Sequence, residues 1–226
     1  MSPKYNLQVD NTMRDVIPYY RIAITGFQEP GISHQKEDHM ESRSISKTDS
    51  RIKTTDLVYV AIGAALIVIC SWISIPTAVP FTLQTFSVFT VLSLLGGRRG
   101  TLSILVYILM GAVGIPVFSG FKGGVGVLLG NTGGYILGFL LTGLIFILFE
   151  RFFGTKTVPV IVALILGLAL CYAFGTAWFM YLYLKNTGEV GLMTVLSWCV
   201  FPFIIPDIIK LTLALFISRR VKHVIK

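Results

Sequence analysis

The chain has 226 residues, of which 54% are hydrophobic and only 13% charged, and its formal net charge is +8. In soluble domains about a quarter of the residues are charged. This composition therefore excludes an ordinary soluble protein and predicts an integral membrane protein. The basic excess does not indicate a nucleic-acid partner, because the Lys and Arg residues gather at the ends of apolar segments, where membrane topology accounts for them.

Residues 1–55 are polar and show no sustained apolar periodicity. Such a segment has too little apolar surface to fold around a core of its own. We therefore predict a disordered cytosolic extension over residues 1–55, followed by a membrane domain over residues 56–226.

The membrane domain divides into six apolar segments separated by basic, Gly or Pro residues. These segments are 57–75, 81–95, 101–118, 127–149, 157–184 and 192–218. A straight membrane-spanning helix needs about 17–25 residues, so the second segment is short for a crossing. The chain is nevertheless expected to be an all-α membrane protein with six transmembrane helices, because the charges of the loops favour six crossings.

The positions of the basic residues predict the topology. If all six segments cross, one side of the membrane receives the clusters at 98–99, 151–156 and 219–226, whereas the other receives only Lys122 and Lys185. Positively charged loops remain on the cytoplasmic side. Both termini are therefore expected in the cytoplasm of a multi-pass protein of the cell membrane.

The loops on the opposite, outer side are rich in Pro and Gly. Seven glycines fall between Gly120 and Gly134, but neither a phosphate-binding loop nor a dinucleotide fingerprint fits their spacing. Two interpretations stay open, namely close helix packing and a loop whose N–H groups approach a ligand. Earlier in the chain, Ala61 and Ala65 form a small-x-x-x-small face that predicts a close helix contact.

Two charges in the last apolar segment point to a function. Asp207 and Lys210 are three residues apart, so a helix places them on one face. Charged residues inside a membrane usually line a cavity, a relay or a ligand site. With Pro206 as the first helical residue, Asp207 would lie about 18 Å from the boundary at Arg219, in the outer half of the membrane. A self-neutralising structural pair is the alternative, and we favour a ligand site.

Several aromatic residues fall in the predicted outer halves or loops, where they would form either an interfacial belt or an apolar wall for a ligand. They are Phe118, Phe121, Tyr135, Tyr172, Trp178 and Trp198. The three cysteines lack the spacing of metal ligands, and no grouping of His with a nucleophile suggests catalysis. We therefore expect no enzyme activity, no metal and no cofactor.

Three stretches together resemble a known family. They are PFTLQTFSVF at 80–89, the block from LGGRRG to GGYILGF at 95–139, and FPFIIPDIIK at 201–210. They are similar to BioY, the biotin-specific S component of energy-coupling-factor (ECF) vitamin transporters, and the similarity runs over roughly residues 57–220. One departure is Asn131, which stands where the family usually has proline.

The resemblance implies a six-helix S component that captures biotin from outside the cell. It also implies that Asp207 and Lys210 match the polar ligand pair of the sixth helix. Ala61 and Ala65 match the surface that docks on a transmembrane coupling protein, which works with two cytosolic ATPases. Because some relatives lack dedicated partners, a stand-alone biotin facilitator or secondary transporter is the alternative function.

The chemistry of biotin fits these residues. Asp207 would accept a hydrogen bond from the ureido N–H, and Lys210 would donate either to the ureido oxygen or to the tail carboxylate. Tyr172 and Trp178 would offer aromatic surface to the rings. The outer loop would cap the site, and its contributing residues are expected to be Ser119, Phe121, Gly124 and Asn131.

Two other classes of function predict different observations. A membrane-embedded enzyme acting on a lipid would need a nucleophile or a metal cluster near the membrane surface, and the sequence offers neither. A structural scaffold predicts that substitution of the charged pair changes no ligand binding, because no ligand binds.

Overall fold

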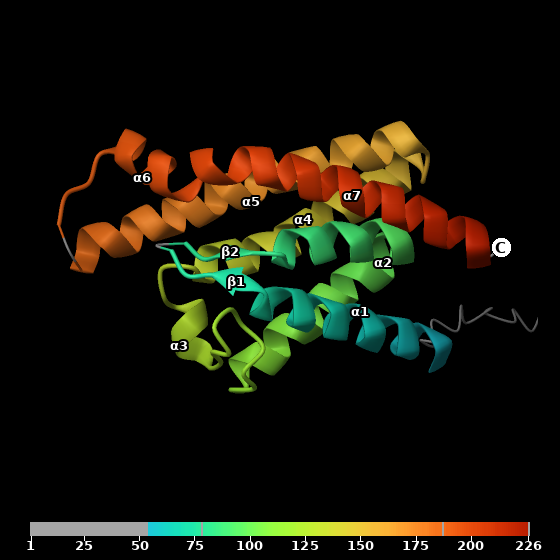
Figure 1. Ribbon diagram of the computed structural model, residues 1–226, viewed down its shortest axis with the longest axis horizontal. Helices are drawn as coiled ribbons and strands as arrows, with labels where there is room; N and C mark the ends of the chain where they lie inside the picture. Colours follow the sequence, from blue (N-terminus) through green and yellow to red (C-terminus); the bar gives the residue numbers. More distant parts are fainter. Residues whose placement is uncertain (1–53, 78, 187, 226) are drawn as a thin grey trace, which may run out of the picture. The chain divides into compact units, whose positions relative to one another are not determined.

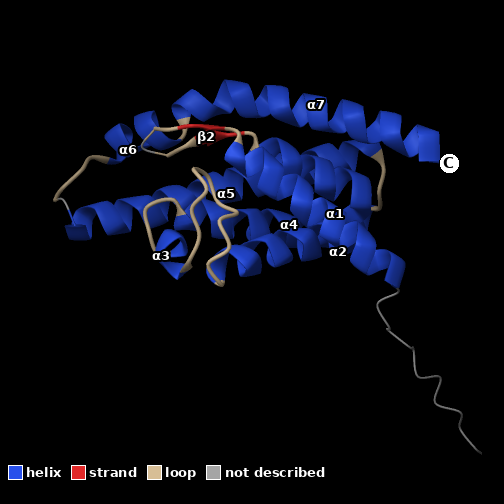
Figure 2. Cartoon of the chain, turned by 60° about the horizontal axis from the view of Figure 1, so that its bottom comes forward, coloured by secondary structure: helices blue, strands red, loops and turns tan. Residues whose placement is uncertain are grey.

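The structure is a computed structural model that describes residues 54–77, 79–186 and 188–225. The predicted extension over residues 1–55 lies outside the described residues, apart from its last two positions. The elements are α1 (Thr54–Trp72), β1 (Ser74–Ile75), β2 (Phe81–Thr82), α2 (Gln84–Ala112), α3 (Val125–Leu128), α4 (Gly133–Phe153), α5 (Thr157–Asn186), α6 (Leu192–Cys199) and α7 (Phe201–Ile225). Apart from one short antiparallel sheet, in which Ser74 pairs with Thr82, the described chain consists of helices and loops (Figure 2).

The predicted all-α membrane class with six spanning segments is confirmed. Five stretches of the described residues are long and apolar enough to cross a membrane, and one of them, α2, contains two of the predicted segments. The helix is interrupted at Gly96, whose φ of +82° is a conformation that favours glycine. Figure 1 shows the chain turning back on itself there, so the two halves of α2 run as separate helices.

A carboxylate from another helix stabilises this turn. The amide N–H of Gly97 donates to Oε2 of Glu150 at 2.6 Å, which satisfies one of the free amide groups at the start of the second half of α2. Nearby, Arg99 forms a salt bridge of 2.5 Å with Asp56. Charged side chains therefore tie α1, α2 and α4 together at the end of the bundle where α1 begins and α7 ends (Figure 1).

Several predicted helix ends were wrong. The segment 57–75 ends as a helix at Trp72, because the chain then enters the β1–β2 hairpin. The segment 101–118 ends as a helix at Ala112, two residues before Gly114, whose φ of +107° is not helical. The segment 127–149 becomes the short α3, a turn, and α4 from Gly133.

The last segment also differs from its prediction, because Val200, with φ −125° and ψ −58°, separates α6 from α7. Pro206 was expected to start the final helix, but it lies inside α7, which already begins at Phe201. Inside a helix, proline lacks the N–H that would bond the carbonyl four residues earlier, here that of Pro202, and its ring crowds that carbonyl. Because α7 begins at Phe201, Asp207 lies in its second turn.

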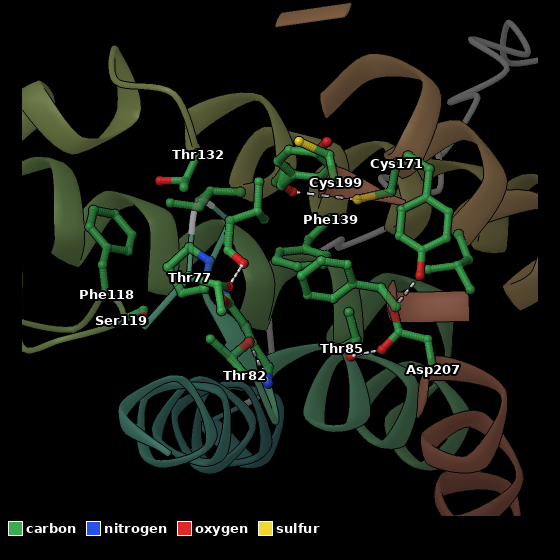
Figure 3. Close-up of a pocket in the computed structure, with 18 of the residues that line it drawn as sticks. Thr77, Thr82, Thr85, Phe118, Ser119, Thr132, Phe139, Cys171, Cys199 and Asp207 are labelled. Carbon is green, nitrogen blue, oxygen red and sulfur yellow. Dashed lines mark hydrogen bonds between the residues drawn. The ribbon is translucent and has the colours of Figure 1, made fainter. Parts of the chain in front are cut away.

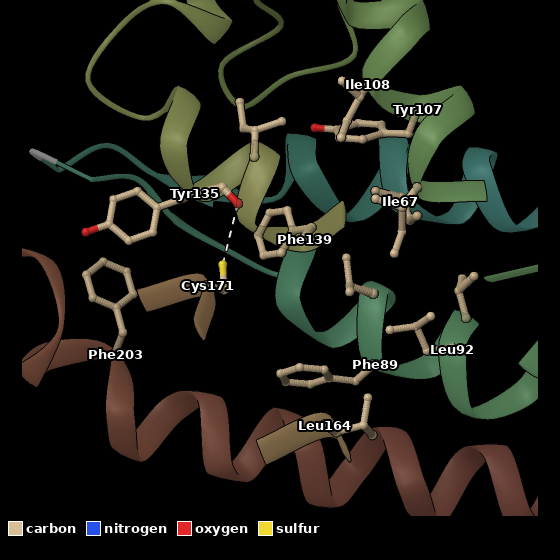
Figure 4. Packing of buried hydrophobic residues seen from close by; sticks show 14 of the residues in the cluster. Ile67, Phe89, Leu92, Tyr107, Ile108, Tyr135, Phe139, Leu164, Cys171 and Phe203 are labelled. Carbon is tan, nitrogen blue, oxygen red and sulfur yellow. Dashed lines mark hydrogen bonds between the residues drawn. The ribbon is translucent and has the colours of Figure 1, made fainter. Parts of the chain in front are cut away.

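The buried core lies between the helices and includes large side chains from α1, α2, α4 and α5 (Figure 4). Helices α4 and α5 approach closely where small residues meet large ones, as where Gly134 faces the Cβ atom of Trp178 and Gly138 faces Cys171. Gly120 and Gly124, in contrast, have φ values of +70° and +93° and lie in the segment between α2 and α4, which we call the outer loop after its predicted side. Close helix packing therefore holds for Gly134 of the glycine cluster. The other interpretation, a loop whose N–H groups approach a ligand, stays a prediction.

Candidate ligand-binding site

A cavity of about 220 Å³ lies inside the helical bundle. It is bounded by the hairpin and the start of α2, by the outer loop, and by α4, α5, α6 and α7 (Figure 3). The lining residues that carry polar groups are Thr77, Thr82, Gln84, Thr85, Ser119, Lys122, Thr132, Tyr135, Cys171, Tyr172, Cys199, Asp207 and Lys210. Such a mixture of apolar wall and converging polar groups is typical of a small-molecule site.

Asp207 and Lys210 form the polar centre of one end of the cavity. Both are buried, and Nζ of Lys210 lies 2.9 Å from Oδ1 of Asp207. The carboxylate accepts two further hydrogen bonds, from the hydroxyl of Thr85 to Oδ1 at 2.8 Å and from the hydroxyl of Tyr172 to Oδ2 at 2.5 Å. Burial of an unpaired charge is costly, and the counterion and the two hydroxyl donors offset that cost for Asp207.

The ammonium group of Lys210 is fully engaged by the protein. Besides Asp207, it donates to the carbonyl oxygen of Thr82 at 2.7 Å and to the hydroxyl oxygen of Thr85 at 3.2 Å. A lysine ammonium has three N–H donors, so none is left for a ligand in this arrangement. Thr85 therefore joins the pair by donating to Asp207 while accepting from Lys210.

Two lining groups, Asp207 and Gln84, still have unused hydrogen-bonding capacity. An ionised carboxylate offers about four lone-pair sites, of which the protein uses two on Oδ1 and one on Oδ2 of Asp207. Gln84 donates from Nε2 to the hydroxyl of Tyr107 at 2.9 Å, which leaves its second N–H and its amide oxygen. The cavity thus offers acceptors on Oδ2 of Asp207 and on the amide oxygen of Gln84, and one N–H donor on Gln84, to a bound molecule.

Apolar rings flank the charged pair. Nζ of Lys210 lies 4.2 Å from the centroid of the Phe81 ring, within the range of a cation–π interaction. The ring of Phe81 in turn stacks on Phe203 at 5.8 Å. Ile136 and Phe139 of α4 extend the apolar lining. A flat, partly apolar ligand with a few polar atoms is therefore a suitable occupant.

Four of the eight predicted binding residues line the cavity, namely Asp207, Lys210, Tyr172 and Ser119. The other four, Trp178, Phe121, Gly124 and Asn131, do not line it. The indole N–H of Trp178 donates to the carbonyl of Gly130 at 3.0 Å, and Phe121 is exposed and stacks on Trp72 at 5.1 Å. These side chains hold the outer loop against its neighbours.

The sequence analysis missed several lining residues. Thr82, Gln84 and Thr85 come from the stretch PFTLQTFSVF, where four polar residues, these three and Ser87, interrupt an otherwise apolar segment. That interruption was the available signal. Lys122 was noted only as a basic residue of the outer side, although its side chain belongs to the lining.

Ala61 and Ala65 are both exposed on α1, whereas Gly63 and Ala64 between them are buried. A small-residue face that is exposed among the described residues is available to another helix. Within the described residues, no group of three His, Cys, Asp or Glu side chains is placed to hold a metal ion.

Comparison with known proteins identifies relatives over most of the chain. The model of the BioY family matches residues 41–226. The biotin transporter BioY of Thermotoga maritima is 39% identical over 168 residues, which cover 74% of this chain and 95% of that protein. The biotin transporter BioY2 of Lactococcus lactis subsp. cremoris is 38% identical, covering 70% of this chain and 85% of that protein.

A solved structure shares the fold. It is the crystal structure of the S-component for biotin from an ECF-type ABC transporter, with a TM-score of 0.66 and 27% sequence identity. The match covers 76% of this chain and 95% of the other. The six-segment helical arrangement described above is thus the S-component fold.

Proposed function

The chain belongs to the BioY family, and we propose that it binds biotin at the Asp207–Lys210 end of its cavity and delivers it into the cell. The relatives are named as biotin transporters, which is a non-enzymatic role in the cell membrane. The observation that carries the assignment to this site is the buried, hydrogen-bonded charge pair, which lies inside an apolar cavity together with Gln84 and Tyr172.

The ureido ring of biotin presents two N–H donors and one carbonyl acceptor in a single plane. The remaining lone pair on Oδ2 of Asp207 suits one ureido N–H, and the second N–H of Gln84 suits the ureido oxygen. Hydrogen bonds to an ionised acceptor are stronger than neutral ones, and more so away from water. Phe139 and Phe203, which both line the cavity, supply apolar surface for the fused rings.

A second proposal concerns how transport is coupled to ATP hydrolysis. We propose that α1 docks through Ala61 and Ala65 on a transmembrane coupling protein that works with two cytosolic ATPases. The support is the exposure of both alanines on a helix that buries Gly63 and Ala64 between them. We also keep the proposal that both termini are cytoplasmic, which rests on the basic residues gathered at the end of the bundle near Arg99 and Arg151.

Calorimetric titration of the detergent-purified protein with biotin tests the binding site. Asp207→Asn and Thr85→Val are each expected to weaken binding by about tenfold or more, because a hydrogen bond to a charged group contributes about 1.5–3 kcal/mol. Lys185→Met, on the exposed end of α5, is the matched control and should bind like the wild type. A folded wild-type protein that binds no biotin would refute the proposal.

Transport in vesicles distinguishes the two modes of uptake. The proposed coupling predicts biotin uptake only when the coupling protein and ATPases are reconstituted with the chain and ATP is supplied. If vesicles that contain this chain alone take up biotin as fast as vesicles with the coupling protein, the ATPases and ATP, the stand-alone transporter is favoured. A labelled cysteine introduced near either terminus and probed from each side of the vesicle tests the proposed orientation.

A further inference from the structure

One charged side chain of the cavity is not used by the network described above. Among the described residues, three charged side chains line the cavity, and these are Asp207, Lys210 and Lys122. Asp207 and Lys210 neutralise each other, whereas Lys122 makes no ion pair within the described part of the chain. The unbalanced charge of this cavity is therefore the single positive charge of Lys122.

The outer loop holds Lys122 at a defined place. The amide N–H of Phe118 donates to the carbonyl of Lys122 at 2.9 Å, which closes a short antiparallel bridge. Phe118 is buried and packs edge-on against Tyr107, with ring centroids 5.5 Å apart. The amide of Gly124 donates to the carbonyl of Gly111 at 2.7 Å. The loop is thus anchored on α2 on both sides of Lys122.

The loop and the charged pair lie at different ends of the cavity. In Figure 3, Phe118 and Ser119 of the outer loop lie at one end, and Asp207 with Thr85 lies at the other. Lys122 is exposed, as is expected for a residue at the mouth of a cavity that opens outward. A ligand that spans the cavity would therefore meet hydrogen-bonding groups without net charge at the inner end and a cation at the outer end.

Biotin has the matching distribution of charge. Its ureido ring is neutral, and its only charge is the carboxylate at the end of a flexible apolar tail. All three N–H groups of Lys210 are already engaged by Thr82, Thr85 and Asp207, so this lysine has no free donor for a carboxylate. We propose that Lys122 binds the carboxylate of the ligand at the outer rim while the Asp207 end holds the ureido ring.

This inference rests on the proposed function and adds an orientation and a source of specificity. Lys122 would favour ligands with a free carboxylate over the same ring system carrying a neutral tail. The effect is that of an ion pair at a partly exposed site, so we expect it to be modest, roughly three- to tenfold in affinity. Closure of the loop over the ligand would increase it, because removal of water strengthens the attraction.

The test compares two ligands and four forms of the full chain. Biotin and biotinamide, which has the same ureido ring and an uncharged tail, are titrated into the wild type, Lys122→Met, Lys122→Arg and Lys185→Met. Lys185 is the control, because it is another exposed lysine of the outer side and does not line the cavity. We expect Lys122→Met to weaken biotin roughly three- to tenfold and to leave biotinamide unchanged, with Lys122→Arg close to the wild type.

Two results would overturn the inference. In the first, Lys122→Met keeps the wild-type preference for biotin over biotinamide, which means that another group binds the carboxylate. In the second, it weakens both ligands equally, which means that Lys122 only supports the loop. Both results leave the proposed function intact, since biotin still binds. If a folded wild-type protein bound neither ligand, both proposals would fail together.

Discussion

The stability of the ligand-free protein offers a sharp test of the charged pair, through the substitution Lys210→Met. The side chain of Asp207 is 1% exposed, and its carboxylate is held by one ammonium group and two hydroxyl groups. Removal of Lys210 leaves the buried carboxylate with two hydroxyl donors and no counterion. Breaking a buried ion pair in this way costs about 3–5 kcal/mol, chiefly because the remaining charge has lost its partner.

The double substitution distinguishes that cost from ordinary loss of packing. In the variant that combines Asp207→Asn with Lys210→Met, no charge is left buried, and the neutral amide that replaces the carboxylate needs no counterion. Because replacing both members of a buried ion pair is often close to neutral, we expect the double variant to be more stable than Lys210→Met alone, by about 2 kcal/mol.

Equilibrium unfolding in mixed micelles of a mild detergent and SDS, without biotin, measures these differences. Trp fluorescence and circular dichroism report on the transition, and Lys185→Met again serves as the control. The reasoning would be refuted if the losses of the two single variants simply added in the double variant, because additivity means that the two residues do not interact.

Four other changes test separate parts of the structure. Tyr172→Phe removes a donor to Asp207 and should weaken biotin binding by about tenfold in calorimetry. Glu150→Ala leaves the amide at the start of the second half of α2 unpaired and should lower the free energy of unfolding by about 1–2 kcal/mol, with Glu150→Gln losing less. Gly134→Leu forces a side chain into the tight contact between α4 and α5 and should cost about 1–3 kcal/mol in the same unfolding assay. Ala61→Trp should leave biotin affinity unchanged but reduce ATP-dependent uptake in vesicles, because a bulky side chain blocks close helix contact.

Each of these expectations has a contrary outcome. Unchanged affinity of Tyr172→Phe would mean that its hydroxyl does not orient the carboxylate. Equal stability of Glu150→Ala and the wild type would show that the α2 turn does not depend on that carboxylate. A stable Gly134→Leu variant would mean that α4 and α5 can separate without cost. Full uptake by Ala61→Trp would place the docking surface elsewhere.

Local properties of the sequence were enough to predict much of this protein. Membrane insertion depends on long apolar stretches, and these are visible without any knowledge of contacts. Asp207 and Lys210 stood out for the same reason, since a charge in an apolar helix is anomalous wherever its partners lie. The spacing of three residues also placed them on one face, and the structure brings them to 2.9 Å.

Trp178 of α5 and two residues of the outer loop illustrate where local reasoning failed. Trp178, Phe121 and Asn131 fall near the site in the chain, and yet none lines the cavity. Proximity along the chain does not say which way a side chain points, and an aromatic residue at the outer end of a helix can serve loop packing as well as a ligand. The helix ends at Trp72 and Ala112 were missed because apolar residues continue past both, through the hairpin and the outer loop.

The sequence by itself determined the membrane class, the number of apolar segments and the charged pair, because hydropathy and charge are properties of short stretches of chain. Only the tertiary structure decided which residues complete the site. Thr85 reaches Asp207 across 122 positions of the sequence and Tyr172 reaches it across 35, and Lys122 meets the same cavity from a loop. Such contacts depend on how the helices pack, since packing alone brings distant polar side chains around one buried carboxylate.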